Sequence, residues 1–300
     1  MEHKRINAKP DGITRLTIYL QIIWSTMKLQ MKQSFARPMF RFCLICNPIV
    51  NTIFLYEMFL NKGIDAFLND VVLGAGLMGI WGCICFSSVG DINRERWSGT
   101  LPLLYVAPGG FGFIIFGKVL GNTMISMVTF VLSYMTAGIL SGQWPVITHV
   151  GCFALSMVLT VMCFIVVSLC FAYIMMLSRK TELYMNLIEI PLVFICGFTF
   201  PIEVLPGWAQ TISNLLAPTW AVRLLRMSCQ SSNGGELSYI DFEMGMSDVV
   251  YHGVSQIDYV LYGQYVGILL IEMAVLILFT IALYRWMDKR VRISATLEVS

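Results

Sequence analysis

The chain has 300 residues, of which 57% are hydrophobic and only 13% are charged. Soluble globular domains carry about 25% charged residues, so this composition excludes a soluble protein and predicts a polytopic membrane protein. The net charge is only +2 and no dense basic patch occurs, which argues against a nucleic-acid partner. We therefore expect a single all-α transmembrane domain over residues 1–300, surrounded by membrane lipid.

The first predicted element is an amphipathic helix over residues 13–35. Apolar residues recur along it at helical spacing, and polar and basic residues line another face. This pattern is typical of an interfacial helix that lies in the membrane surface. Pro38 is expected to end the helix.

Six apolar segments follow, each near the about 20 residues that a helix needs to cross a bilayer. The third and fourth are longer than this minimum, and the fifth is short and ends at Pro201. The predicted transmembrane helices cover residues 40–60, 71–89, 111–140, 150–177, 183–200 and 259–286.

Residues 201–226, between the fifth and sixth spans, are moderately apolar but interrupted by prolines. This segment is too broken to span, so we expect a re-entrant pair of short helices that dips into the outer leaflet. Trp208 and Trp220 would then lie at the level of the lipid headgroups. The polar and acidic stretch 228–256 is predicted to be an external loop.

Lysine and arginine residues are concentrated on one side of the predicted membrane. They lie in the N-terminal stretch, in the loops after the second and fourth spans, and in the C-terminal tail. The opposite side carries only Lys62, Arg223 and Arg226. The positive-inside rule therefore places both termini in the cytoplasm.

The chain offers no recognisable catalytic or metal-binding motif. Its histidines are scattered outside the spans, and no HExxH or serine nucleophile motif occurs. The segment Gly112-x-x-x-x-Gly117-Lys118 imitates a phosphate-binding loop, but Val119 stands where serine or threonine should hold magnesium. We therefore predict that the chain is no enzyme and binds no metal or cofactor. Gly117-x-x-x-Gly121 has a spacing that lets two helices approach closely.

Three glutamates, Glu57, Glu189 and Glu272, lie within apolar spans. An ionised group there is costly, so each must face a cavity, find a partner or stay protonated. Two interpretations stay open: the three residues line a substrate or ion path, or they make interhelical hydrogen bonds.

Residues 91–108, between the second and third spans, are predicted to form a short cytoplasmic helix that receives movement from another subunit. Gly99 and Thr100 allow a sharp bend, and Glu95 and Arg96 could form ion pairs with a partner. The residues expected to offer an apolar face to that partner are Leu101, Leu103, Leu104 and Tyr105.

Two motifs resemble those of ABC-2 type permeases, the membrane subunits of ABC exporters. The first is Glu95-Arg96-x-x-Gly99-Thr100-Leu101-x-x-Leu104-x-x-x-Pro108, followed by Gly117-Lys118. The second is Gly197-x-x-Phe200-Pro201, then Leu205-Pro206-x-Trp208, Pro218-x-Trp220-Ala221 and Leu225-Arg226.

This resemblance implies a six-helix permease of a bacterial cell membrane that pairs with a second copy or with a homologous permease. It also implies two copies of a cytoplasmic ATPase subunit, which would bind ATP and magnesium. The residues that the resemblance assigns to ATPase coupling are Glu95, Arg96, Gly99, Thr100, Leu101, Leu104 and Pro108. The implied activity is export of a small amphipathic molecule, such as a drug, an antibiotic or a lipid.

Three alternatives stay open at this point. A permease for polysaccharides or teichoic acids would share the same motifs. A secondary transporter without an ATPase would use Glu189 and Glu272 as a proton relay. A membrane anchor or sensor would pair with an ATPase and transport nothing.

Overall fold

The computed structural model describes residues 12–59, 64–107, 110–144, 147, 149–177, 191–199, 202, 205–229, 235–237, 251–253 and 259–294. Its helices are α1 (Gly12–Ala36), α2 (Pro38–Phe59), α3 (Ile64–Trp97), α4 (Leu101–Val106), α5 (Phe111–Ser141), α6 (Val150–Leu177), α8 (Gly207–Ser213), α9 (Ala217–Cys229) and α10 (Tyr259–Ser294). Two short strands, β1 (Gly235–Leu237) and β2 (Tyr251–Gly253), pair antiparallel, with Gly235 opposite Gly253.

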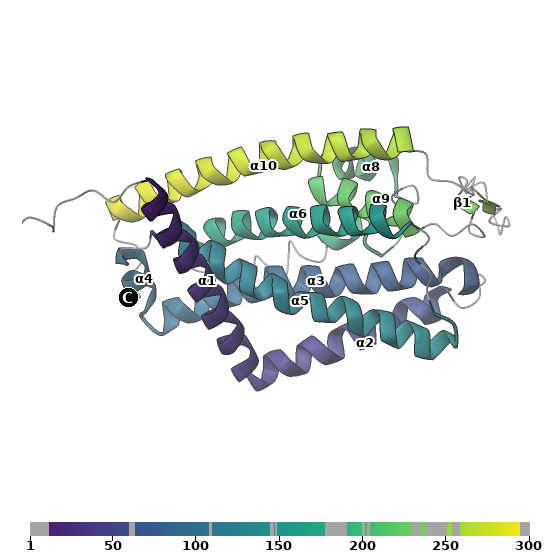
Figure 1. The fold of residues 1–300 in the computed structure, drawn as a ribbon, viewed down its shortest axis with the longest axis horizontal. Helices are drawn as coiled ribbons and strands as arrows, with labels where there is room; N and C mark the ends of the chain where they lie inside the picture. Colours follow the sequence, from purple (N-terminus) through teal and green to yellow (C-terminus); the bar gives the residue numbers. More distant parts are fainter. Residues whose placement is uncertain are drawn as a thin grey trace, which may run out of the picture.

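The long helices lie along one common axis, with α4 at one end of the bundle and β1 at the other (Figure 1). We refer to these as the α4 end and the β1 end. The first helix, α1, crosses the others obliquely near the α4 end and packs against α5. A single residue, Arg37, separates α1 from α2, which begins at Pro38.

Among the described residues, four helical segments are long and apolar enough to cross a membrane: Pro38–Met58, Phe111–Ser141, Val150–Met176 and Tyr259–Arg290. They coincide with the first, third, fourth and sixth predicted spans, so the chain is a multi-pass membrane protein. The second predicted span lies within α3, whose apolar part, Leu68–Ile84, is shorter than these four. The fifth lies mostly outside the described residues, and the count of six stays a prediction.

Two helices extend well beyond the predicted limits. The second span was expected over residues 71–89, but α3 runs from Ile64 to Trp97, and α10 continues to Ser294 rather than ending at residue 286. The added turns are polar and charged, so hydrophobicity alone does not reveal them. Because α3 runs as far as Trp97, Asp91, Glu95 and Arg96 all lie on the same helix as the apolar segment Leu68–Ile84.

The core of the bundle is built around a buried tryptophan, Trp81 of α3. Its ring meets Phe164, Phe171 and Phe198 edge-on, at centroid distances of 5.3, 6.2 and 5.7 Å. Aromatic pairs favour this geometry, and dense packing is the main force that joins helices in lipid. These contacts hold α3 and α6 against the turn that follows residue 195.

At the β1 end, α8 and α9 occupy the segment predicted as a re-entrant pair, and α9 runs on to Cys229. The guanidinium of Arg226 donates to the carbonyl oxygens of Gly197 and Phe198, at 3.0 and 3.3 Å. Asn69 of α3 donates to the carbonyl oxygen of Cys229 at 2.8 Å. These bonds fasten α9 to the bundle, and its depth in the membrane stays a prediction.

The close helix approach predicted from Gly117-x-x-x-Gly121 is confirmed, and the partner helix is α1. A Cβ atom on Gly117 would lie 2.8 Å from the carbonyl oxygen of Ile23, and one on Gly121 would lie 2.9 Å from that of Met27. Both distances are shorter than a carbon–oxygen contact allows. Only glycine at these two positions lets the backbones of α1 and α5 meet.

The substitution Gly121→Ala should therefore weaken the packing of α1 on α5. We expect a loss of about 1–3 kcal/mol of stability, because overpacking at a rigid backbone forces the helices apart. The measurement is the melting temperature of the purified chain in detergent. Gly151→Ala is the matched control, since nothing lies within 4 Å of a Cβ atom there. Equal melting temperatures for both variants would contradict the assigned role of Gly121.

Candidate functional site

The candidate site is the corner where α3 turns into α4, which we call the α3–α4 corner (residues 94–106). It was expected as one helix over residues 91–108, but the structure divides it: α3 ends at Trp97 and α4 begins at Leu101. Gly99 has a φ of +68°, and the amide of Thr100 donates to the carbonyl oxygen of Glu95 at 3.0 Å. Glycine adopts this left-handed conformation without strain, which explains why the helix breaks here.

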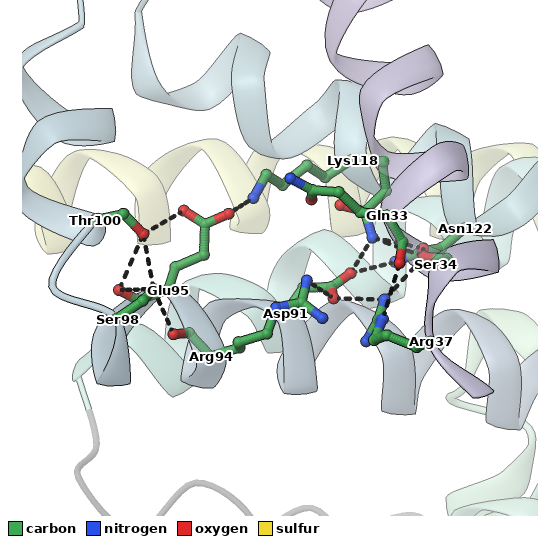
Figure 2. A network of polar contacts seen from close by, with 11 residues as sticks. Gln33, Ser34, Arg37, Asp91, Arg94, Glu95, Ser98, Thr100, Lys118 and Asn122 are labelled. Atoms are coloured by element: carbon green, nitrogen blue, oxygen red, sulfur yellow. Dashed lines mark hydrogen bonds and ion pairs between the residues drawn. The ribbon is translucent and has the colours of Figure 1, made fainter. Parts of the chain in front are cut away.

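A buried carboxylate, Asp91, lies at the centre of a polar network beside this corner (Figure 2). Its Oδ1 accepts from Arg37 at 3.0 Å and from Arg94 at 2.8 Å. Its Oδ2 accepts from Asn122 at 3.1 Å and also from the amide of Gln30. Asp91 is only 1% exposed, and a buried anion is tolerated when donors surround it in this way.

The network extends from α3 to α5 and to α1. The Oδ1 atom of Asn122 on α5 accepts from Gln30 and Ser34 of α1, at 3.0 and 3.3 Å. Arg37 also donates to Ser34 at 2.9 Å. Partial burial lowers the pKa of Arg37 from its ordinary value, while the nearby Asp91 carboxylate opposes this shift. The network thereby joins α1, α3 and α5 through charged and amide groups.

Glu95 turns inward rather than toward a possible partner. Its carboxylate pairs with Lys118 of α5, and both side chains are largely buried (Figure 2). Lys118 belongs to the segment that imitates a phosphate-binding loop, yet this segment is the N-terminal part of the continuous helix α5. The two residues of the Gly117-Lys118 motif therefore have separate structural tasks: Gly117 admits α1, and Lys118 pairs with Glu95.

Arg96 joins the α3–α4 corner to a further helix, α6. Its guanidinium donates to the carbonyl oxygen of Met176 at 2.7 Å. The last carbonyl groups of a helix lack partners within the helix and carry the negative end of its dipole. An arginine is therefore a favourable cap at this position, and it couples the end of α3 to the end of α6.

The short helix α4 has an inward and an outward face. Leu101 is 1% exposed and belongs to the core, and Leu104 packs against that core. Tyr105 donates its hydroxyl proton to the carboxylate of Asp288 on α10, and its ring lies 5.7 Å from that of Phe111. Of the residues expected to face a partner, Leu101 thus faces the chain itself, because Pro102 and the turn at Gly99 fix the register of α4.

The outward face of the corner consists of Leu103 and Val106 on α4 together with Trp97, the last residue of α3; Trp97, Leu103 and Val106 are 81%, 73% and 80% exposed. Sequence reasoning named Leu103 but missed Trp97 and Val106. The spacing of the apolar residues could have revealed Val106, because residues 103 and 106 share one side of a helix while residues 101, 104 and 105 share the other. Pro108, the remaining predicted coupling residue, lies outside the described residues.

A mostly apolar groove of about 730 Å³ runs between α1 and α4. Ile18, Ile22 and Leu29 line it from α1, and Leu103 and Leu104 line it from α4. The Glu95–Lys118 ion pair contributes to the same lining. The groove is therefore continuous with the outward face of α4 through Leu103.

Two of the three glutamates predicted for a substrate path, Glu57 and Glu272, lie on different helices. Glu57 is exposed on α2, whereas Glu272 lies on α10 at the opposite side of the bundle (Figure 1). The Oε1 atom of Glu272 accepts from the indole of Trp220 at 3.1 Å, and its Oε2 atom is buried without a partner among the described residues. Glu189 lies outside those residues.

The bundle of apolar helices defines a multi-pass membrane protein, and its α4 end carries the two-faced corner described above. The family model of the ABC-2 type transporter matches residues 21–229, more than half of the chain. The chain therefore belongs to the ABC-2 type transporter family and is a permease of an ABC transporter. The match includes α1 from residue 21 onward, the α3–α4 corner and α9. A search of curated proteins finds no match.

Replacing Asp91 should destabilise the α4 end of the bundle. We expect Asp91→Asn to cost about 2 kcal/mol or more, because Arg37 and Arg94 lose the charge that they share. Thermal unfolding of the purified chain would measure this loss. Glu57→Gln makes the same type of change at an exposed position and should leave the melting temperature unchanged. Equal melting temperatures for Asp91→Asn and Glu57→Gln would show that the network does not stabilise the fold.

Proposed function

We propose that this chain is the membrane subunit of an ATP-driven exporter and that a separate ATPase subunit docks at the α3–α4 corner. The main support for this proposal is the outward face, on which the apolar side chains of Trp97, Leu103 and Val106 are exposed. Three large apolar side chains beside an apolar groove are typical of a surface that another protein covers. Family membership supports an ATPase as that protein, because ABC transporters contain one.

The proposed orientation places the α4 end and both termini in the cytoplasm of a bacterial cell. It is supported by basic residues at this end, such as Arg94, Arg285 and Lys289, and by the positive-inside rule. An ATPase must meet its permease on the side where ATP is available. The orientation and the docking surface therefore support one another.

The inward bonds of the corner suggest how movement reaches the membrane helices. Glu95 connects the corner to α5 through Lys118, and Arg96 connects it to α6 through the carbonyl oxygen of Met176. Tyr105 connects α4 to α10 through Asp288. When the ATPase closes on ATP and magnesium and presses the outward face, these bonds pass the displacement to three helices.

The transport unit would contain two permeases and two ATPase subunits. Either a second copy or a homologous permease would complete the path. We propose a small amphipathic substrate, a drug, an antibiotic or a lipid, because the core of the bundle is mainly apolar but also buries polar side chains such as Asn122 and Ser126. Glu272 is the best-supported path residue, since its Oε2 atom lacks a partner among the described residues. Glu57 and Glu189 remain candidates for the same path.

The test is to purify the tagged chain from native membranes and to quantify the co-purified ATPase subunit by mass spectrometry. We expect Val106→Asp to reduce the bound ATPase by about tenfold or more, because a buried unpaired charge at a docking surface weakens binding strongly. Val150→Asp is the matched control, being an exposed valine at the opposite end of the bundle.

Two results would contradict the proposal. Equal amounts of ATPase on both variants would show that the outward face of α4 is not the docking surface. Transport by the purified chain alone, with no ATPase bound to the wild type, would favour the secondary transporter instead.

A further inference from the structure

The first helix has three faces, and two of them are already assigned. One face packs against α5 and carries Gln30 and Ser34 into the Asp91 network. A second face lines the groove with Ile18, Ile22 and Leu29. The third face is marked by Leu20, Trp24, Lys28 and Phe35, which recur at helical spacing.

This third face is exposed and combines apolar and basic groups. Leu20, Trp24 and Phe35 are 57%, 56% and 44% exposed, and Lys28 is also exposed. The ammonium nitrogen of Lys28 lies 4.9 Å from the centre of the Trp24 ring, within the range of a cation–π contact. We call these four residues the lipid-facing surface of α1.

All the charged residues of α1 are basic. Between Gly12 and Ala36 the helix contains Arg15, Lys28 and Lys32 but no aspartate or glutamate. Tryptophan prefers the headgroup level of a bilayer, and lysine extends its apolar stem along lipid while its ammonium group reaches the phosphates. A surface of this composition complements an anionic membrane.

We propose that the lipid-facing surface binds anionic phospholipids of the leaflet at the α4 end, with the lipid phosphate at Lys28 beside Trp24. Leu20 and Phe35 enter the acyl-chain boundary on either side of this pair. The occupant is a membrane lipid, and neither free phosphate nor an acidic surface of the ATPase supplies the apolar contact that these residues require. The assignment of the leaflet to the cytoplasmic side rests on the proposed function.

The position of the site gives the lipid an effect beyond anchoring. The opposite face of α1 donates to Asp91 and Asn122, which lie beside the α3–α4 corner. Because α1 is a single helix, lipid bound on one face favours the position in which the opposite face contacts Asp91 and Asn122. Anionic lipid thereby stabilises the contacts that hold the α4 end together.

The experiment titrates the full-length chain in detergent with phosphatidylglycerol and with phosphatidylcholine, and native mass spectrometry reports the bound lipid. One lysine near an anionic lipid contributes enough to change the affinity about fivefold. We expect Lys28→Gln to bind phosphatidylglycerol about fivefold more weakly than the wild type and to bind phosphatidylcholine equally well.

Lys289→Gln is the matched control, because Lys289 is also exposed, near the C-terminal end of α10, and its substitution removes the same charge. It should retain wild-type affinity for phosphatidylglycerol. Trp24→Leu keeps an apolar side chain but removes the ring, and it should bind phosphatidylglycerol more weakly. Equal melting temperatures of the variants establish that each has folded.

Unchanged phosphatidylglycerol affinity in Lys28→Gln overturns the proposal, as does an equal loss in Lys289→Gln. If Lys28→Gln instead lowers the amount of co-purified ATPase without changing lipid affinity, the surface belongs to the ATPase and the lipid assignment is wrong. The lipid titration uses the chain alone, so its failure leaves the proposed docking of an ATPase at Val106 intact.

Discussion

The buried carboxylate of Asp91 is the charge around which the α4 end of the bundle is assembled. A buried anion is stable only while donors surround it, and the donors here come from α1, α3 and α5. Moving any of these helices away would leave charge or amide groups without partners. Gly117 and Gly121 make this arrangement sterically possible, since they let α1 come close enough to α5 for Gln30 to reach Asp91.

The α3–α4 corner depends on this framework for its position. Its inward groups are engaged by Lys118, Met176 and Asp288, so the corner cannot move independently of α5, α6 and α10. Its outward groups are apolar and exposed. If an ATPase docks on the outward groups, as proposed, this one short segment receives movement on its outward side and transmits it to the helices on its inward side. The anionic lipid proposed at α1 would hold the framework from the membrane side.

Much of the fold could be predicted from the sequence, because long apolar runs determine where membrane helices lie. The expected spans 111–140 and 150–177 match α5 and α6 almost residue for residue. The site was less predictable. The partners of Glu95 and Arg96 lie 23 and 80 residues away, and local spacing carries no information about such contacts. Leu101 is predicted from the sequence to face a partner, because the apolar residues near a polar loop cannot be divided into inward and outward ones until the register of the helix is known.

The Glu95–Lys118 ion pair is proposed to carry movement from the α3–α4 corner to α5. The most direct measurement is the ratio of substrate transported to ATP hydrolysed by the reconstituted complex, for Glu95→Lys, Lys118→Glu and the double exchange. Each single variant places like charges together and should lower this ratio strongly. The double exchange restores opposite charges and should recover most of the coupling. Recovery would support the claim, whereas a double variant as uncoupled as either single one would contradict it.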